Sequence, residues 1–136
     1  IAGCSIVIKH YFDQCKIIGV EPELFNDTQL SIKNGKRTSV DINQSTHCDA
    51  LMARTPGKLT FPINQDLLTS VETVNEQQVK QAMRFAFEEF NLVVEPGGAV
   101  ALAFALNHNF PIKNANILIL LSGGNIDPGR FDELIK

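Results

Sequence analysis

The sequence has no tryptophan, a single tyrosine and only three cysteines among its 136 residues. Cys4, Cys15 and Cys48 lie far apart and lack the close spacing of zinc ligands. The fold therefore depends neither on a disulfide framework nor on a cysteine-bound metal. We expect reduced, mostly buried thiols, which fits a cytoplasmic protein.

Basic residues are also scarce. The chain has 12 Lys and Arg against 15 Asp and Glu, which gives a net charge of -3, and no basic run is present. This charge pattern argues against a nucleic-acid partner. No apolar run is long enough to span a bilayer, which argues against membrane insertion.

What the chain does have is a globular composition, with 44% hydrophobic and 20% charged residues. Its length suits one domain, which we place at residues 1–136. The chain opens with Ile1, without a methionine and without the charged start of a signal peptide. Apolar side chains then follow at helical spacing at once: Cys4, Val7, Ile8 and Tyr11. We expect Ile1 to lie inside a larger protein; a processed N-terminus is the alternative.

The order of predicted elements is that of an α/β protein. The apolar patterns predict strands at 16–20, 70–74 and 116–121. They predict helices at about 2–13, 26–34, 66–68, 75–90, 96–107 and 128–135, with a polar surface loop at 35–48. Short apolar strands joined by helical crossovers predict a mostly parallel sheet covered by helices on both faces.

The helix at 75–90 has the clearest signals. Asn75 and Gln78 form a capping-box pattern at its start. An apolar stripe predicts its buried face: Val79, Ala82, Met83, Ala86, Phe87 and Phe90. The helix at 96–107 is apolar all round and is expected to be buried.

Two stretches are candidates for chemistry. Glu95 precedes Pro96 at the mouth of the buried helix, where it is either a functional acid or a simple helix cap. Ser122-Gly123-Gly124-Asn125 follows a predicted strand and precedes a helix. Such a turn can present backbone amides and a hydroxyl to a ligand, although a plain tight turn has the same sequence.

A third candidate is an oxygen cluster after the first predicted strand. Glu21 and Asp27 are two carboxylates separated by a short turn. Carboxylates and backbone carbonyls suit Mg²⁺ or Ca²⁺. A charged helix start without a metal is the alternative.

Five motifs together resemble a known family. They read Ile1-Ala2-Gly3, Gly19-Val20-Glu21-Pro22, Pro56-Gly57-Lys58-Leu59-Thr60-Phe61-Pro62-Ile63, Val94-Glu95-Pro96-Gly97-Gly98-Ala99 and Leu121-Ser122-Gly123-Gly124-Asn125-Ile126-Asp127. Their order and spacing resemble the C-terminal half of the pyridoxal-phosphate threonine/serine dehydratases and serine racemases, which have fold type II and are tryptophan synthase β-like. The resemblance covers nearly the whole chain.

The resemblance implies roles for individual residues. Ser122 matches the serine that hydrogen-bonds the pyridine nitrogen of pyridoxal phosphate, and Glu95 matches an acid beside the cofactor. Ala50 matches a position near the ring where relatives often have glycine after the aspartate, here Asp49. Glu21 and Asp27, with the carbonyl of Phe25, match the divalent-cation site of metal-activated members.

The resemblance also implies an activity and what it needs. The implied reaction is β-elimination from L-threonine or L-serine to a 2-oxo acid and ammonia. Serine racemase and 3-hydroxyaspartate dehydratase are the alternatives within the family, and a non-catalytic α/β module is the alternative outside it. The family's Schiff-base lysine and tetraglycine phosphate loop would lie upstream of Ile1, so we expect this chain to be inactive alone. The resemblance further implies a homodimer and, with no regulatory domain after Lys136, the short catabolic-type architecture.

Overall fold

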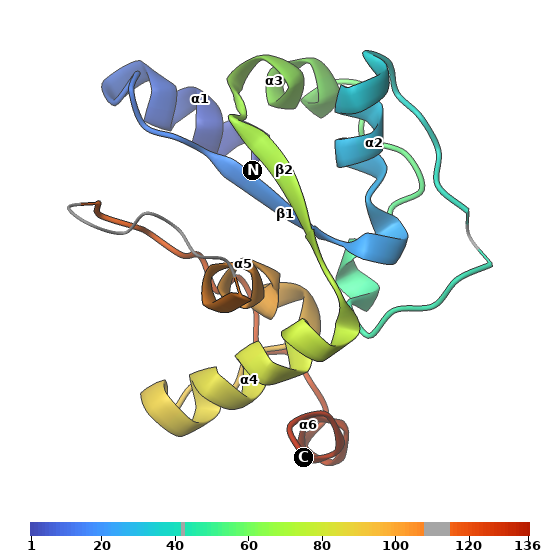
Figure 1. The fold of residues 1–136 in the computed structure, drawn as a ribbon, viewed down its shortest axis with the longest axis vertical. Coiled ribbons are helices and arrows are strands. Elements are labelled where there is room, and N and C mark those ends of the chain that lie inside the picture. Colours follow the sequence, from blue (N-terminus) through green and yellow to red (C-terminus); the bar gives the residue numbers. More distant parts are fainter. Residues whose placement is uncertain (42, 108–114) are drawn as a thin grey trace.

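A parallel pair of strands is the centre of the fold (Figure 1). A computed structural model describes residues 1–41, 43–107 and 115–136. β1 (Ile18–Pro22) pairs in parallel with β2 (Ser70–Val74). Parallel strands need a crossover connection, and this one contains η1 (Glu23–Phe25), α2 (Asp27–Asn34), η2 (Asp49–Leu51) and α3 (Thr60–Leu67). The predicted α/β class with a parallel sheet is confirmed, and the strand at 70–74 has the predicted bounds.

Helices lie on both sides of this pair (Figure 1). α1 (Ala2–Tyr11) packs against α3 on one side. On the other side, α5 (Pro96–Asn107) contacts both strands and α4 (Glu76–Phe90) packs along α5. α6 (Pro128–Leu134) lies against α4, where the rings of Phe87 and Phe131 meet edge to face with centroids 5.4 Å apart. The middle position of α5 explains why its sequence is apolar on every face.

Local signals set the start of α4 as predicted. The Asn75 side chain accepts a hydrogen bond from the Gln78 amide at 3.0 Å, and the Gln78 side chain accepts one from the Asn75 amide at 2.9 Å. Four residues of the predicted stripe are buried: Val79, Ala82, Met83 and Ala86. Phe87 and Phe90 are about half exposed instead.

α1 confirms the helix predicted at about 2–13, although most of its regularly spaced apolar side chains do not pack inward. Cys4, Val7 and Tyr11 are exposed, whereas Ala2 and Ser5 are buried. The Ser5 hydroxyl donates to the Ala2 carbonyl at 2.8 Å, so this small face needs no outside polar partner. The prediction that most thiols are buried is wrong, because only Cys48 is buried and all three cysteines are free.

α3 is longer than the short helix predicted at 66–68, and it ends at Leu67. It begins at Thr60 and carries Pro62 in its first turn, where a missing N–H costs nothing because those amides have no partner within the helix. No helix in the described part of the chain is both long and apolar enough to cross a membrane.

The predicted strand at 116–121 is not a strand in the described structure. Residues 115–127 form neither helix nor sheet. Leu118 is 85% exposed and Leu120 64% exposed, while Ile119 and Leu121 pack against the core. The alternation is that of a strand, but neither described strand pairs with it.

Candidate functional site

The predicted cofactor residues meet at the N-terminus of α5. On one side, the Cβ of Ala50 lies 3.5 Å from the position that a Cβ on Gly97 would take. On the other side, the backbone O and N of Gly123 lie 2.7 and 2.9 Å from the corresponding position on Gly98. The paired glycines therefore let η2 and the Ser122–Asn125 loop approach the start of the same helix.

Glu95 holds that loop in place. Its amide donates to the Gly123 carbonyl at 3.0 Å, and its Oε2 accepts from the Asn125 amide at 3.1 Å. Its own carbonyl accepts from the amides of Gly98 and Ala99. The backbone of Glu95 thus begins α5, while its carboxylate reaches the neighbouring loop. This geometry goes beyond the simple helix cap that the sequence left open.

Ser122 and Ala50 are both exposed, and Glu95 is partly buried between them and the core. Gly97 and Gly98 are buried: a Cβ on Gly97 would meet Ala50 and Leu51, and a Cβ on Gly98 would meet the Gly123 backbone. The Ser122 hydroxyl can donate a hydrogen bond to a nitrogen acceptor in a planar ring. The chemistry of Ser122 therefore fits the ring nitrogen of pyridoxal phosphate.

The acidic candidates lie together at the end of β1. Glu21 is in the strand, and its Oε1 and Oε2 accept hydrogen bonds from the amides of Thr28 (3.1 Å) and Gln29 (3.0 Å). Asp27 begins α2 and is 4% exposed. Burial first, and then the negative charge of Glu21, raises the pKa of Asp27 to about 6. Phe25, which supplies the third predicted oxygen, is buried in the turn between them.

Glu21 and Asp27 repel each other, which would favour a bound cation. Two carboxylates alone, however, are few ligands for a metal ion. Among residues 1–41, 43–107 and 115–136, no group of three or more His, Cys, Asp or Glu side chains could hold a metal ion. Glu21 and Asp27 also line a pocket of about 230 Å³, whose other walls include Ala50 and Gly57. The acidic pair and η2 therefore share one cavity.

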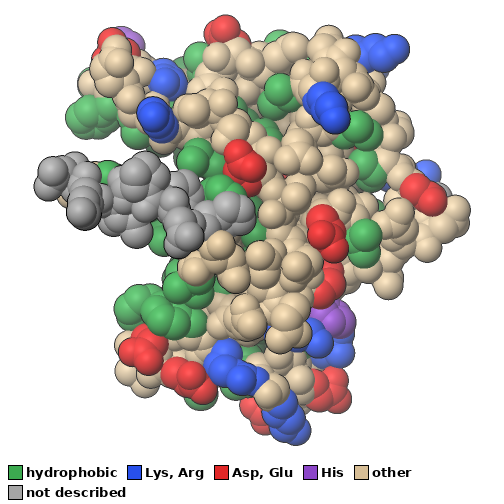
Figure 2. Space-filling view, viewed as in Figure 1, with side chains coloured by type: hydrophobic (Ala, Val, Ile, Leu, Met, Phe, Trp, Pro, Cys, Tyr) green, Lys and Arg blue, Asp and Glu red, His purple; other side chains and the backbone are tan. Residues whose placement is uncertain are grey.

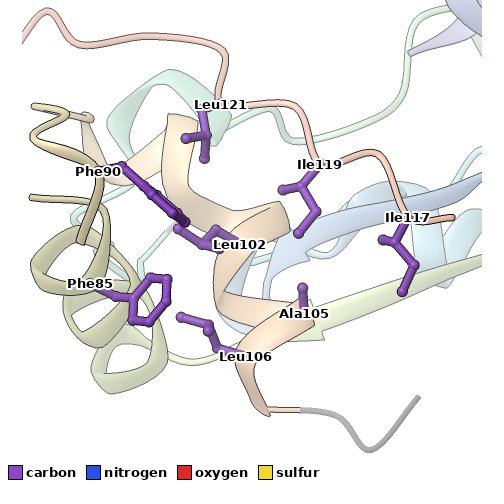
Figure 3. Close-up of a pocket in the computed structure, with 8 residues that line it drawn as sticks. All are labelled: Phe85, Phe90, Leu102, Ala105, Leu106, Ile117, Ile119 and Leu121. Carbon is purple, nitrogen blue, oxygen red and sulfur yellow. The ribbon is translucent and has the colours of Figure 1, made fainter. Parts of the chain in front are cut away.

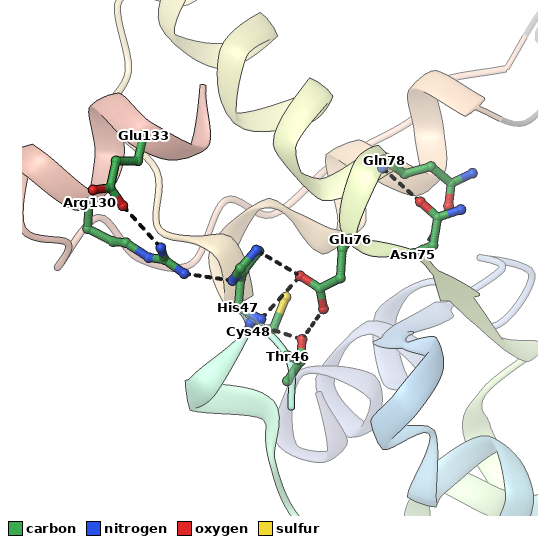
Figure 4. A network of polar contacts seen from close by, with 8 residues as sticks. All are labelled: Thr46, His47, Cys48, Asn75, Glu76, Gln78, Arg130 and Glu133. Carbon is green, nitrogen blue, oxygen red and sulfur yellow. Dashed lines mark hydrogen bonds and ion pairs between the residues drawn. The ribbon is translucent and has the colours of Figure 1, made fainter. Parts of the chain in front are cut away.

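A polar network next to the site was missed by the sequence reasoning (Figure 4). Glu76 in α4 accepts from the Thr46 hydroxyl and, at 3.1 Å, from the His47 amide. Arg130 in α6 donates to Nδ1 of His47 at 2.8 Å. The sequence predicts 35–48 only as a polar surface loop. Nothing in its pattern indicates that Thr46 contacts the start of a helix 30 residues later.

An apolar groove of about 430 Å³ lies beside the C-terminal half of α5 (Figure 3). Side chains from α4, α5 and the extended segment converge on it: Phe85, Phe90, Leu102, Leu106, Ile119 and Leu121. Figure 2 shows hydrophobic side chains gathered where the C-terminal part of α4 reaches the surface. Among the described residues, the C-terminal half of α5, away from the candidate site, thus borders an apolar groove.

Comparison with known proteins gives one consistent family. The chain matches, over residues 1–123, the family described as pyridoxal-phosphate dependent enzyme. It is 33% identical over 136 residues to the L-threonine ammonia-lyase of Thermotoga maritima. It is 30% identical to the serine racemase of Schizosaccharomyces pombe and 32% identical to the L-threo-3-hydroxyaspartate ammonia-lyase of Saccharomyces cerevisiae. All of this chain is covered in each case, but it spans only 33%, 42% and 41% of those proteins.

Solved structures agree. Maize serine racemase superposes with a TM-score of 0.87 at 30% identity, covering 97% of this chain and 42% of that one. A threonine deaminase described as from T.th. superposes with a TM-score of 0.85 at 33% identity, covering 93% and 42%. The fold, the assembled glycines with Glu95 and Ser122, and the family match over residues 1–123 lead to one conclusion: this chain belongs to the pyridoxal-phosphate-dependent enzymes of fold type II.

Proposed function

We propose that this chain is part of a pyridoxal-phosphate-dependent ammonia-lyase that acts on L-threonine or L-serine. The observation that carries the proposal is the contact of Glu95 with the Ser122–Asn125 loop at the N-terminus of α5, with Ala50 on the other side. The similarity to threonine and 3-hydroxyaspartate ammonia-lyases supports the reaction class.

Each residue has a proposed task. The bound cofactor would supply the electron sink that the reaction needs. Ser122 would orient the ring through a hydrogen bond to its nitrogen. Because a hydroxyl is neutral, it would not favour a protonated ring nitrogen, which suits elimination, where the leaving group takes the electrons. Glu95 would keep the Ser122 loop in position, and Ala50 would pack near the ring.

The activity belongs to the whole protein. None of the lysines in residues 1–136 lies in a motif that resembles the family's Schiff-base lysine, so we propose that this chain is inactive by itself. Its partners would be the remaining part of the same polypeptide, a small amino-acid substrate and a second copy in a homodimer. The free thiols fit a reducing compartment such as the cytoplasm.

The test uses the parent protein that contains this chain. Borohydride reduction and mass spectrometry should locate a cofactor–lysine adduct outside residues 1–136. L-threonine should yield 2-oxobutanoate, and L-serine should yield pyruvate. Ser122→Ala should shift the cofactor absorbance and lower turnover, whereas Ser45→Ala, an exposed serine of the loop before η2, should change neither. Turnover without bound cofactor would refute the proposal.

Serine racemase is the second candidate, because the chain is 30% identical to that of Schizosaccharomyces pombe. Formation of D-serine in excess of pyruvate from L-serine would favour it. Exclusive turnover of L-threo-3-hydroxyaspartate would favour the third relative's reaction. Absence of both cofactor binding and turnover would favour the non-catalytic α/β module.

We also propose a divalent-cation site at Glu21, Asp27 and the Phe25 carbonyl. The raised pKa of Asp27 beside Glu21 supports it, because a cation would relieve the repulsion between the two carboxylates. Mg²⁺ should raise the unfolding temperature of the parent protein and should not do so in Asp27→Asn. Equal shifts in both proteins would mean that the ion binds elsewhere.

A further inference from the structure

The loop that leads into η2 is held by one carboxylate of α4 (Figure 4). Glu76 Oε1 accepts from the Thr46 hydroxyl, and Oε2 accepts from the His47 amide at 3.1 Å. The Thr46 hydroxyl oxygen in turn accepts from the Cys48 amide at 3.1 Å. The Glu76 carboxylate therefore bonds two consecutive residues of the loop, and the Thr46 hydroxyl extends the chain of hydrogen bonds to Cys48.

These contacts decide where Ala50 lies. The Cys48 side chain is fully buried, and the Cys48 carbonyl accepts from the Leu51 amide at 2.9 Å, which closes the turn of η2. Ala50 is the middle residue of that turn and faces Gly97. Its own side chain is too small to anchor it, so its position follows from the residues on either side.

The same network reaches the other half of the site. Arg130 donates to Nδ1 of His47 at 2.8 Å, and its guanidinium also pairs with Glu133 at 3.2 Å. Since a guanidinium only donates, Nδ1 must accept and Nε2 carries the hydrogen. That hydrogen faces Glu76, with Nε2 and Oε2 3.9 Å apart. α6, which carries Arg130, follows directly on the Ser122–Asn125 loop.

We infer that Glu76 is a positioning residue: through Thr46 it fixes Ala50 at the cofactor site, and through His47 and Arg130 it links that loop to the element after Ser122. The inference rests on the proposed function, because it takes Ala50 to face the cofactor. Glu76 itself is not a catalytic residue in this scheme. Its carboxylate gains from lying at the N-terminus of α4, where negative charge is favoured, and from accepting two hydrogen bonds as an anion.

The experiment uses the parent protein with two variants of Thr46, one variant of Glu76 and one control. Thr46→Val keeps the shape of the side chain but removes its hydroxyl, and Thr46→Ser keeps the hydroxyl. Glu76→Gln keeps one acceptor and turns the other into a donor, so it can no longer accept from both the Thr46 hydroxyl and the His47 amide. Glu89→Gln is the control, because Glu89 is an exposed carboxylate at the far end of the same helix.

Two readouts separate a positioning role from a merely structural one. Hydrogen exchange at the Cys48 and Leu51 amides should be about tenfold faster in Thr46→Val, as expected for loss of one hydrogen bond, and unchanged in Thr46→Ser. Affinity for pyridoxal phosphate should fall about tenfold in Thr46→Val and Glu76→Gln, with a shifted cofactor absorbance band. Thr46→Ser and Glu89→Gln should match the wild type.

Each outcome has one meaning. If exchange accelerates but cofactor affinity and absorbance stay at wild-type values, the network is only structural and the inference is overturned. If exchange does not change, Glu76 does not fix the loop and the inference is overturned as well. If the wild-type parent binds no cofactor at all, the proposed function has failed, and the exchange contrast between Thr46→Val and Thr46→Ser still decides whether Glu76 fixes the loop.

Discussion

Two segments of this chain, each in a region where the sequence predicts a strand, have different structures. Ile18–Pro22 finds a parallel partner in Ser70–Val74 and becomes a strand. In residues 117–121, Ile119 and Leu121 pack against the core, and the described side chains that line the groove with them come from α4 and α5. The result is one face packed and one face, with Leu118 and Leu120, in solvent. We call the β1–β2 pair with the crossover between the two strands the closed region. We call residues 117–121 with the apolar groove the open region.

The difference shows that a strand needs more than its own pattern. Hydrogen bonds of a sheet come from a neighbour, and apolar residues on both faces need two covers. In the closed region, both come from residues within the chain. In the open region, we expect the rest of the parent protein to supply the neighbouring strand and the second cover. The groove and the exposed leucines support this expectation, and this chain spans only 33% to 42% of the length of the relatives described above.

The largest expected effect tests the open region directly. In the parent protein, Leu118→Asp should lower the free energy of unfolding by roughly 4 kcal/mol, because an unpaired carboxylate would be buried. In residues 1–136 alone, the same change should stay within about 0.5 kcal/mol, because the site is exposed. Chemical denaturation of both proteins measures the contrast. Equal effects in the two would mean that nothing covers this face in the parent.

A smaller loss is expected where the open region meets the candidate site. A Cβ on Gly98 would lie 2.7 Å from the Gly123 carbonyl oxygen, so Gly98→Ala should cost about 3 kcal/mol and displace the Ser122 loop. Gly3→Ala is the matched control, since it lies in α1 with nothing within 4 Å of the new methyl group, and it should stabilise α1 slightly. Thermal unfolding and cofactor titration of the parent would measure both. A tolerated Gly98→Ala would contradict the close approach.

The two regions also differ in how well the sequence predicts them. Asn75 and Gln78 specify the start of α4 through contacts three residues apart, and Gly35 ends α2 with a positive φ of 65°. Such signals are local, so they are readable without the structure. The buried face of α1 is not, because it depends on which helix packs against it. In α1, the small residues Ala2 and Ser5 are buried, whereas the larger Val7 and Tyr11 are exposed.

The candidate site was predictable only where a family motif marked it. Glu95 and Ser122 were found through their motifs, and the structure adds that Glu95 bonds the loop of Ser122. Glu76 and Thr46 carry no motif and lie 30 residues apart. Their bond exists because the crossover returns the chain to the start of α4, which is a property of the tertiary fold.

A further prediction concerns the closed region and pH. Because the pKa of Asp27 is raised to about 6, the folded protein holds this proton over a pH range in which the unfolded chain has lost it. The associated stability is present below pH 4 and is lost as the pH rises through 6, a change of about 2 kcal/mol. Asp27→Asn should remove it, so the stability of the variant relative to wild type should rise by that amount from pH 4 to pH 7 in EDTA. A constant difference would show that Asp27 does not titrate in this way.

The smallest expected effect compares two helix ends with the same backbone. α2 ends at Gly35 (φ 65°) in the closed region, and α4 ends at Asn91 (φ 55°) beside the open one. A Cβ on Gly35 would meet nothing within 4 Å, so Gly35→Asn should cost only the backbone penalty of a left-handed residue, a few tenths of a kcal/mol, and Gly35→Ala about 1 kcal/mol. Asn91→Gly should gain about as much as Gly35→Asn loses. Denaturation of the parent protein and of residues 1–136 measures the pair. If Asn91→Gly were neutral only in the parent protein, the parent would make contacts that hold the C-terminus of α4 in place. The surface that the parent covers would then extend from the groove to Asn91.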